Sequence, residues 1–219
     1  MIFCPLDIPP IPDKQQILDT FAGDETFAWW REETLLGEKN LSIPFGGPGK
    51  WTEKSKKYPQ LVEWIKQHFP FEYFVYIRIA RSRGNVWPHV DANYAKAPLP
   101  HHMTMEQWMI DHIRQNEPAG YRFIVGGSRS NLYMCKNYDP EYKDQTILDQ
   151  RKHYCTIPED TDAFVINHQD QPHGVDVDES DCDRLVGFVV GKLDIDKHKN
   201  LLNISSSKYR QHTVTLIND

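Results

Sequence analysis

The chain has 219 residues, a formal net charge of −6 and 12% aromatic residues. This length can bury one sizeable hydrophobic core without a second domain, and the aromatic content excludes a largely disordered chain. An acidic chain with no long basic run is not expected to bind nucleic acid directly. The N-terminus is broken by prolines and has no basic flank, which is not the pattern of a signal peptide or a membrane span, so we expect a cytoplasmic protein.

Helical signals come first along the chain. From Lys57 to Phe69, apolar residues recur on one helical face, and Pro70 ends the pattern. The pattern then changes to short segments rich in β-branched and aromatic residues, separated by Gly, Pro, Asn and Asp. The expected strands are 71–79, 86–91, 121–125, 131–136, 152–156, 163–167 and 185–190. Many short strands after N-terminal helices predict a mainly β fold with flanking helices, built as a sandwich or a barrel.

We expect a single domain over residues 1–219. A helical and loop region extends to residue 70, a β core covers 71–194, and a C-terminal extension covers 195–219. The insertion 92–120 interrupts the strands and carries a helical pattern with a plausible capping box. It either packs as a structural helix on the core or forms a wall or lid over a site, because it leaves directly from the strand end that carries two candidate metal ligands.

These two candidates are His89 and Asp91. Because one residue separates them, their side chains point to the same face of an extended strand and can bind one cation. His168 and His173 compete for the place of a third ligand. His173 opens the predicted return strand whereas His168 lies in the preceding turn, and we prefer the ligand on the more rigid element. Two histidines and one carboxylate form the face that holds ferrous iron and leaves further positions open.

Arg184 opens a strand that is otherwise apolar. Its planar, permanently charged guanidinium is suited to a carboxylate. A surface ion pair with the acidic run 176–183 is the alternative for this residue.

In this order and spacing, the motifs resemble the signature of the Fe(II)- and 2-oxoglutarate-dependent oxygenases. Residues 163–167, 172–175 and 184–194 are similar to the C-terminal half of the aspartyl/asparaginyl β-hydroxylase and proline hydroxylase branches. In those branches a strand ends in Asn or Asp, a Pro/Ser-His-x-Val motif follows, and an Arg opens the last barrel strand. The similarity covers about residues 72–194, and the chain departs from the β-hydroxylases in its full HxD motif and its long insertion.

The resemblance implies a double-stranded β-helix, or jelly roll, with Fe(II), 2-oxoglutarate and O2 as cofactor and cosubstrates. The three predicted ligands, His89, Asp91 and His173, would be the catalytic iron site, and Arg184 would bind the distal carboxylate of 2-oxoglutarate. Arg122 resembles a second anion-binding arginine of some relatives, with an exposed strand arginine as the alternative. Tyr133 is also placed in the cosubstrate pocket.

The implied reaction converts 2-oxoglutarate and O2 to succinate and CO2 and hydroxylates a substrate. The expected substrate is an amino acid, a peptidyl residue or a comparable small polar metabolite. One alternative is a cupin-like metal-binding or sensing module without turnover. Another is a metal-dependent hydrolase or isomerase on the same barrel, and release of succinate distinguishes the oxygenase from both.

Overall fold

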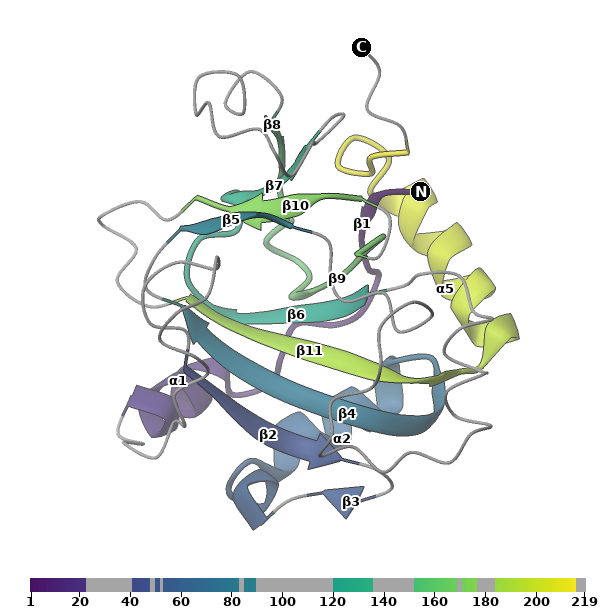
Figure 1. Cartoon of the computed structure of the whole chain (residues 1–219). Helices are drawn as coiled ribbons and strands as arrows, with labels where there is room; N and C mark the ends of the chain where they lie inside the picture. Colours follow the sequence, from purple (N-terminus) through teal and green to yellow (C-terminus); the bar gives the residue numbers. More distant parts are fainter. Residues whose placement is uncertain are drawn as a thin grey trace, which may run out of the picture.

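A computed structural model shows two antiparallel sheets with helices on the outside (Figure 1). It describes residues 1–22, 41–47, 50–51, 53–82, 85–89, 120–135, 152–168, 171–176 and 184–215. Asp91 and the insertion 92–120, apart from Gly120, lie outside the described residues. Among the described helices, none has the length and apolar composition needed to cross a lipid bilayer.

The helices are α1 (Lys14–Ala22), the 3-10 helix η1 (Glu53–Lys57), α2 (Pro59–His68) and α5 (Ile195–Lys208). The helix predicted for 57–69 is α2, which begins at a proline where its missing N–H costs nothing and ends before Pro70. The C-terminal extension contains α5, which the apolar pattern did not indicate. Its N-cap is Asp194, whose side chain accepts a hydrogen bond from the backbone N of Lys197 at 3.1 Å.

The large sheet has the strand order β1-β9-β6-β11-β4-β2-β3. Its strands are β1 (Phe3–Pro5), β2 (Leu41–Gly47), β3 (Lys50–Trp51), β4 (Phe71–Ser82), β6 (Gly120–Gly126), β9 (Ala163–Ile166) and β11 (Arg184–Leu193). The long β11 lies at the centre and pairs with β4 on one side and β6 on the other. The N-terminal region expected to be helical and loop-like therefore adds β1, β2 and β3 to the edges of this sheet.

The small sheet has the strand order β5-β10-β7-β8. Its strands are β5 (Val86–His89), β7 (Leu132–Cys135), β8 (Lys152–Cys155) and β10 (His173–Val175). From β4 onward the chain passes back and forth between the sheets, with β4, β6, β9 and β11 in the large sheet and β5, β7, β8 and β10 in the small one. This winding is that of a double-stranded β-helix, so the predicted fold class is confirmed, and each predicted strand overlaps an observed one.

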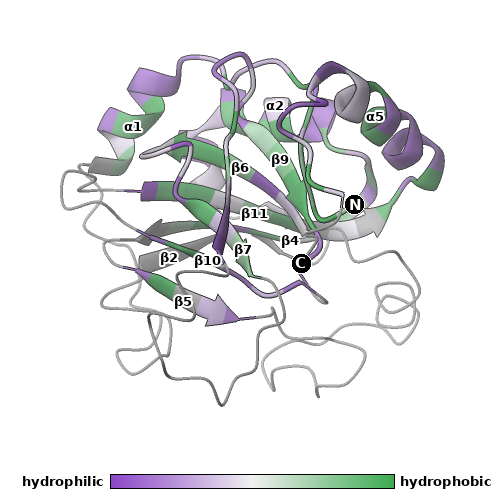
Figure 2. Ribbon diagram, turned by 90° about the horizontal axis from the view of Figure 1, so that it is seen from above, coloured by the Kyte–Doolittle hydropathy of each residue, from purple (hydrophilic) through white to green (hydrophobic). Residues whose placement is uncertain are grey.

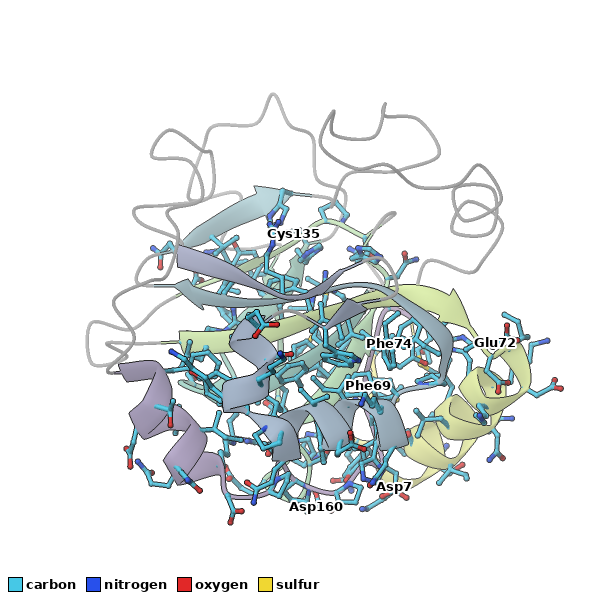
Figure 3. The ribbon with its side chains drawn as sticks, turned by 90° about the horizontal axis from the view of Figure 1, so that it is seen from below. Asp7, Phe69, Glu72, Phe74, Cys135 and Asp160 are labelled. Carbon is cyan, nitrogen blue, oxygen red and sulfur yellow. The ribbon has the colours of Figure 1, made fainter. Side chains whose placement is uncertain are left out.

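The large sheet is buried on both faces. Tyr121, Phe123 and Val125 of β6 pack toward α1 and α2, whereas Ile124 belongs to the cluster between the two sheets. Trp64 of α2 meets the ring of Phe123 edge to face, with ring centroids 5.6 Å apart. Figure 2 shows hydrophobic colour along the inner strands and hydrophilic stretches on α1 and α5. Figure 3 shows side chains filling the layer between α2 and the large sheet.

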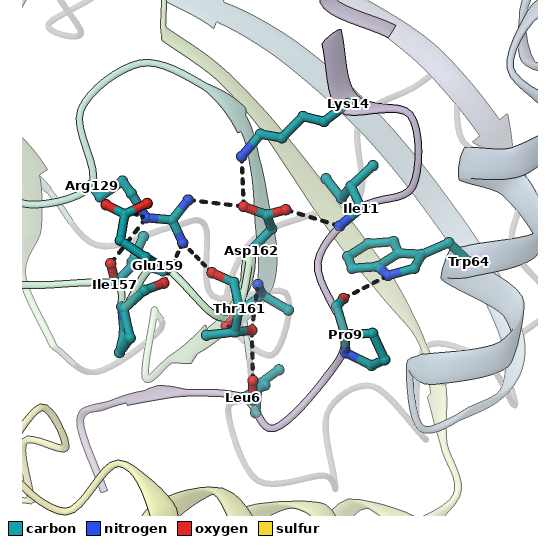
Figure 4. Close-up of polar contacts among 12 residues, drawn as sticks. Leu6, Pro9, Ile11, Lys14, Trp64, Arg129, Ile157, Glu159, Thr161 and Asp162 are labelled. Carbon is teal, nitrogen blue, oxygen red and sulfur yellow. Dashed lines mark hydrogen bonds and ion pairs between the residues drawn. The ribbon is translucent and has the colours of Figure 1, made fainter. Parts of the chain in front are cut away.

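The N-terminal segment is tied to the core by a cluster around the buried Asp162, drawn in Figure 4. Asp162 accepts hydrogen bonds from Lys14 Nζ at 2.6 Å and Arg129 Nη1 at 2.8 Å through Oδ1. Its other oxygen, Oδ2, accepts from the backbone N of Ile11 at 2.9 Å. Arg129 also donates to the carbonyl oxygens of Ile157, Pro158 and Thr161. We call Asp162, Lys14 and Arg129 the Asp162 cluster.

Candidate metal centre

His89 and His173 lie side by side in the small sheet. His89 ends β5, His173 opens β10, and the two residues are direct partners in the antiparallel pairing. Directly opposed residues project to the same face of a sheet. The centroids of the two imidazole rings are 4.7 Å apart and the ring planes are inclined by 46°. The structure thus brings together the two histidines that the sequence predicted to be ligands.

The hydrogen bond at His173 sets which of its ring nitrogens can bind a metal. Nδ1 lies 3.0 Å from the carbonyl oxygen of Gln171. A carbonyl oxygen can only accept, so Nδ1 carries the proton and donates, and Nε2 is the ring nitrogen whose lone pair can bind a metal. Metal-binding histidines in proteins are oriented in this way by a second hydrogen bond.

The turn before His173 is itself held in place. The side-chain amide of Gln171 donates to the carbonyl oxygen of Cys135, and the backbone N of Cys135 donates to the carbonyl oxygen of Pro172 at 2.8 Å. Both bonds tie the turn to the end of β7. The imidazole of His173 therefore projects from a fixed backbone, as a preorganised ligand requires.

His173 faces the space between the sheets. Val175, two residues along β10, belongs to the hydrophobic cluster that Leu132 and Val186 form there, and residues two apart on a strand share a face. His173 is 6% exposed and His89 is half-buried. The predicted third ligand, Asp91, lies beyond the end of β5. Within the described parts of the chain, no three His, Cys, Asp or Glu side chains gather as a metal site.

The rival histidine, His168, has a packing role near the end of β9. It is buried, and its ring lies against the backbone of Gly120, the first residue of β6. A Cβ atom at Gly120 would lie 2.7 Å from His168 Cδ2, so only glycine leaves room for the ring there. This contact, together with the pairing of His89 with His173, favours His173 as the ligand.

Arg184 opens β11 and is buried, with 6% of its surface exposed. The alternative of a surface arginine is therefore wrong. Arg184 and Val186 lie on the same face of β11, and Val186 packs between the sheets. The side chain of Arg184 therefore leaves β11 on the face toward the space between the sheets, which His173 also faces. Gly127, at φ 93°, passes directly beneath it, and a Cβ atom there would lie 2.8 Å from the Cα atom of Arg184. The turn after β6 needs glycine for both reasons.

Arg122 is also buried, at 4% exposure, so the alternative of an exposed strand arginine is wrong as well. It pairs across the sheet with Phe188 of β11, and its guanidinium carbon lies 4.4 Å from the centre of that ring. Nη1 donates to the carbonyl oxygen of Tyr121 at 3.2 Å. Arg122 is level with Phe188, which is four residues from Arg184 on β11. The backbone positions of the two arginines are therefore about 13 Å apart along the strand direction, on the inner face of the large sheet.

Tyr133 lies on the other face of the small sheet. It is the partner of Gly174, the residue between His173 and Val175, and its hydroxyl donates to the carbonyl oxygen of Val86 at 3.0 Å. Its ring contacts Tyr154, and Lys152 Nζ lies 4.7 Å from the ring centre. The structure therefore does not bring Tyr133 to the face that carries the two histidines.

The position that the sequence did not reveal is Met134. Met134 of β7 pairs with His173 of β10 on one side and with His153 of β8 on the other. His89, His173, Met134 and His153 thus form one row across the small sheet, which we call the histidine row. Strand pairing between residues far apart in the sequence creates this row, and no local sequence signal marks Met134 or His153 as its members.

No family model matches the sequence, and no curated protein matches it. Among solved structures, the chain is similar to a prolyl-4-hydroxylase from Pseudomonas putida, with 13% identity, a TM-score of 0.41 and coverage of 83% of this chain and 88% of that one. It is similar to a Trichoplax adhaerens prolyl hydroxylase in complex with a hypoxia inducible factor peptide fragment, with 12% identity, a TM-score of 0.40 and coverage of 85% and 78%.

A third similar structure is SnoN, a non-heme α-ketoglutarate-dependent epimerase from nogalamycin biosynthesis. The identity is 13%, the TM-score 0.43, and the match covers 83% of this chain and 74% of that one. At these identities the similarity concerns the course of the chain, and a function has to be assigned from the side chains of this protein.

Proposed function

We propose that this protein is an Fe(II)- and 2-oxoglutarate-dependent oxygenase. Its proposed substrate is an amino acid, a peptidyl residue or a small polar metabolite, which it hydroxylates while 2-oxoglutarate is converted to succinate and CO2. The observation that carries the proposal is the direct pairing of His89 with His173 on one face of the small sheet, with their ring centroids 4.7 Å apart.

The donor set fits ferrous iron. His89 and His173 supply two imidazoles, and Asp91, two residues after His89, supplies the carboxylate of a two-histidine, one-carboxylate face. When bound, ferrous iron would supply the oxidising chemistry of the reaction with the 2-oxo acid and O2. The protein orients the ligands. The carbonyl oxygen of Gln171 does this for His173 by accepting a hydrogen bond from Nδ1–H, which also makes the imidazole a better electron donor.

Arg184 is the proposed partner of the distal carboxylate of 2-oxoglutarate. Its guanidinium can form two parallel hydrogen bonds to a carboxylate, and this geometry fixes the orientation of the diacid as well as its position. The residue is buried at the start of β11, where the surrounding apolar side chains strengthen a charge pair. The close approach of Gly127 fixes the backbone from which the side chain extends.

Arg122 is proposed to bind a second carboxylate, of the cosubstrate or of the substrate. Its guanidinium carbon lies over the ring of Phe188, a cation–π contact that stabilises the cation. A substrate that carries a carboxylate, such as a free amino acid, fits this charge.

Anaerobic titration with Fe(II) and 2-oxoglutarate tests the proposal. Chelation of ferrous iron by the 2-oxo acid should give a weak visible charge-transfer band. Fe(II) alone, and Fe(II) with succinate, which lacks the 2-oxo group, are the controls and should give no band. Absence of the band from folded protein with iron bound would rule out 2-oxoglutarate as cosubstrate.

A further inference from the structure

Met134 lies beside the candidate metal centre on the inner face of the small sheet. It is directly opposite His173 in the pairing of β7 with β10, and directly opposed residues have Cβ atoms about 5 Å apart. Met134 is 0% exposed and packs in the cluster between the sheets, with Leu132 and Val175. Its thioether is therefore shielded from solvent and next to a proposed iron ligand.

Methionine is more easily oxidised than the other apolar side chains that could fill this position. Leucine or valine would fill the same space without a lone pair that can accept oxygen, whereas methionine sulfur is converted to the sulfoxide by two-electron oxidants. An oxidising metal site beside a methionine, with no substrate bound, has this sulfur as a nearby target.

We propose that Met134 is a site of self-oxidation, which the protein modifies when 2-oxoglutarate and O2 are consumed without substrate. This inference rests on the proposed function. One oxygen atom of O2 enters the new carboxylate of succinate as CO2 leaves, and the other forms an S–O bond with a lone pair of the Met134 sulfur. The four electrons that O2 gains come in pairs from 2-oxoglutarate and from the thioether, so no further reductant is needed.

The neighbouring oxidisable groups differ from Met134 in place or chemistry. Cys135, labelled in Figure 3, follows Met134 and projects to the opposite face of β7. Burial raises the pKa of its thiol to about 11, outweighing the opposite effect of Lys152, so it stays protonated and poorly reactive at neutral pH. Met1 is 48% exposed and should react first with any oxidant in solution.

Oxidation of Met134 should inactivate the protein. A sulfoxide places a polar oxygen in a fully buried apolar position, where both its volume and its unmet hydrogen bonding disturb the packing beneath His173. Activity should therefore fall in parallel with the fraction of Met134 that is oxidised.

Mass spectrometry of the protein after uncoupled turnover tests the proposal. Protein with Fe(II) and 2-oxoglutarate is exposed to O2 without substrate, and the tryptic peptide of residues 130–136 is fragmented. We expect a gain of one oxygen at Met134 that requires 2-oxoglutarate, while Met1 stays reduced. Dilute hydrogen peroxide without iron is the reference. It should oxidise Met1 before Met134, because oxidation by a reagent in solution depends on the exposure of the side chain.

The outcomes separate the two proposals. Succinate release with Met134 still reduced, or with the oxygen on Tyr133 or Cys135, overturns the self-oxidation while the proposed function stands. No succinate overturns both. If Met1 is oxidised before Met134 in the turnover sample, the oxidant acts from solution, and this result also overturns the self-oxidation. In the Met134→Leu variant, which keeps the apolar volume, activity should decay more slowly than in the unchanged protein.

A second measurement tests the geometry without turnover. With 13C-methyl methionine, Co(II) in the site should strongly shift or broaden the signal of Met134 relative to Zn(II) and leave that of Met1 in place, with Met134→Leu giving the assignment. An unchanged Met134 signal, with Co(II) bound through His173, would show that the sulfur is too distant to be oxidised.

Discussion

The Asp162 cluster and the histidine pair are two buried groups of polar side chains that are built in opposite ways. In the Asp162 cluster a carboxylate meets two cations and a backbone N–H, so the protein itself satisfies the charge. In the histidine pair two groups of the same kind face each other at 4.7 Å. Two neighbouring imidazoles are a donor set that a divalent cation can share. The first arrangement indicates a structural role, and the second is the proposed metal site.

The sharpest test of this contrast is the loss of one histidine. His173→Ala should weaken Fe(II) or Co(II) binding by at least about 100-fold, because it removes one of three proposed protein ligands. Isothermal titration under anaerobic conditions measures the change. His168→Ala is the matched control: it removes a buried imidazole that packs on Gly120 and should leave the affinity for the metal near normal. If the two variants exchange behaviour, the ligand assignment is wrong.

The next effect concerns the cosubstrate. Arg184→Ala should leave metal binding intact and raise the Kd for 2-oxoglutarate by at least about 30-fold, since losing one partner of a buried charge pair costs about 2 to 5 kcal/mol. Arg184→Lys keeps the positive charge but lacks the two parallel N–H donors of the guanidinium, and it should recover part of the affinity for 2-oxoglutarate. Arg210→Ala, at an exposed position, is the control. Equal affinity in Arg184→Ala would remove this residue from the site.

Substitutions in the Asp162 cluster should change the stability of the protein and leave its binding of metal and 2-oxoglutarate unchanged. Asp162→Asn leaves two cations beside a neutral amide and should lower the free energy of unfolding by about 3 kcal/mol, measured by urea denaturation. Glu159 is 92% exposed and lies 3.7 Å from Arg129, so Glu159→Gln should change stability by less than about 0.5 kcal/mol. Weakened metal binding in folded Asp162→Asn would contradict the separation of the two clusters.

The sequence predicted the fold and part of the site because the signals for both are local. The spacing of His89 and the turn before His173 can be seen in short segments, as can the apolar strand that Arg184 opens. The face on which Tyr133 lies and the row that contains Met134 depend on strand register, which is set by pairing between distant segments. The helix α5 was missed because its apolar residues form no helical stripe: a buried His and Ser face the core beside the partly buried Leu201 and Leu202.

The last effect concerns the response of stability to alkaline pH. Burial raises the pKa of Cys135 to about 11 and of Cys155 to about 12. Above pH 9 the unfolded chain loses these protons while the folded chain keeps them, so stability should fall as pH rises from about 9 to 11. The slope is at most about 1.4 kcal/mol per pH unit for each thiol, and it is measured by urea denaturation under reducing conditions. Cys155→Ala should flatten the slope. An unchanged slope would mean that Cys155 is not buried as a thiol.

The most direct test of the central claim is the formation of succinate from 2-oxoglutarate by the purified protein with Fe(II), in the presence and absence of O2. The pairing of His89 with His173 predicts succinate that requires O2, that persists in His168→Ala, and that disappears in both His89→Ala and His173→Ala. Folded, iron-loaded protein that forms no succinate in O2, or succinate that survives the loss of either histidine, would contradict the claim.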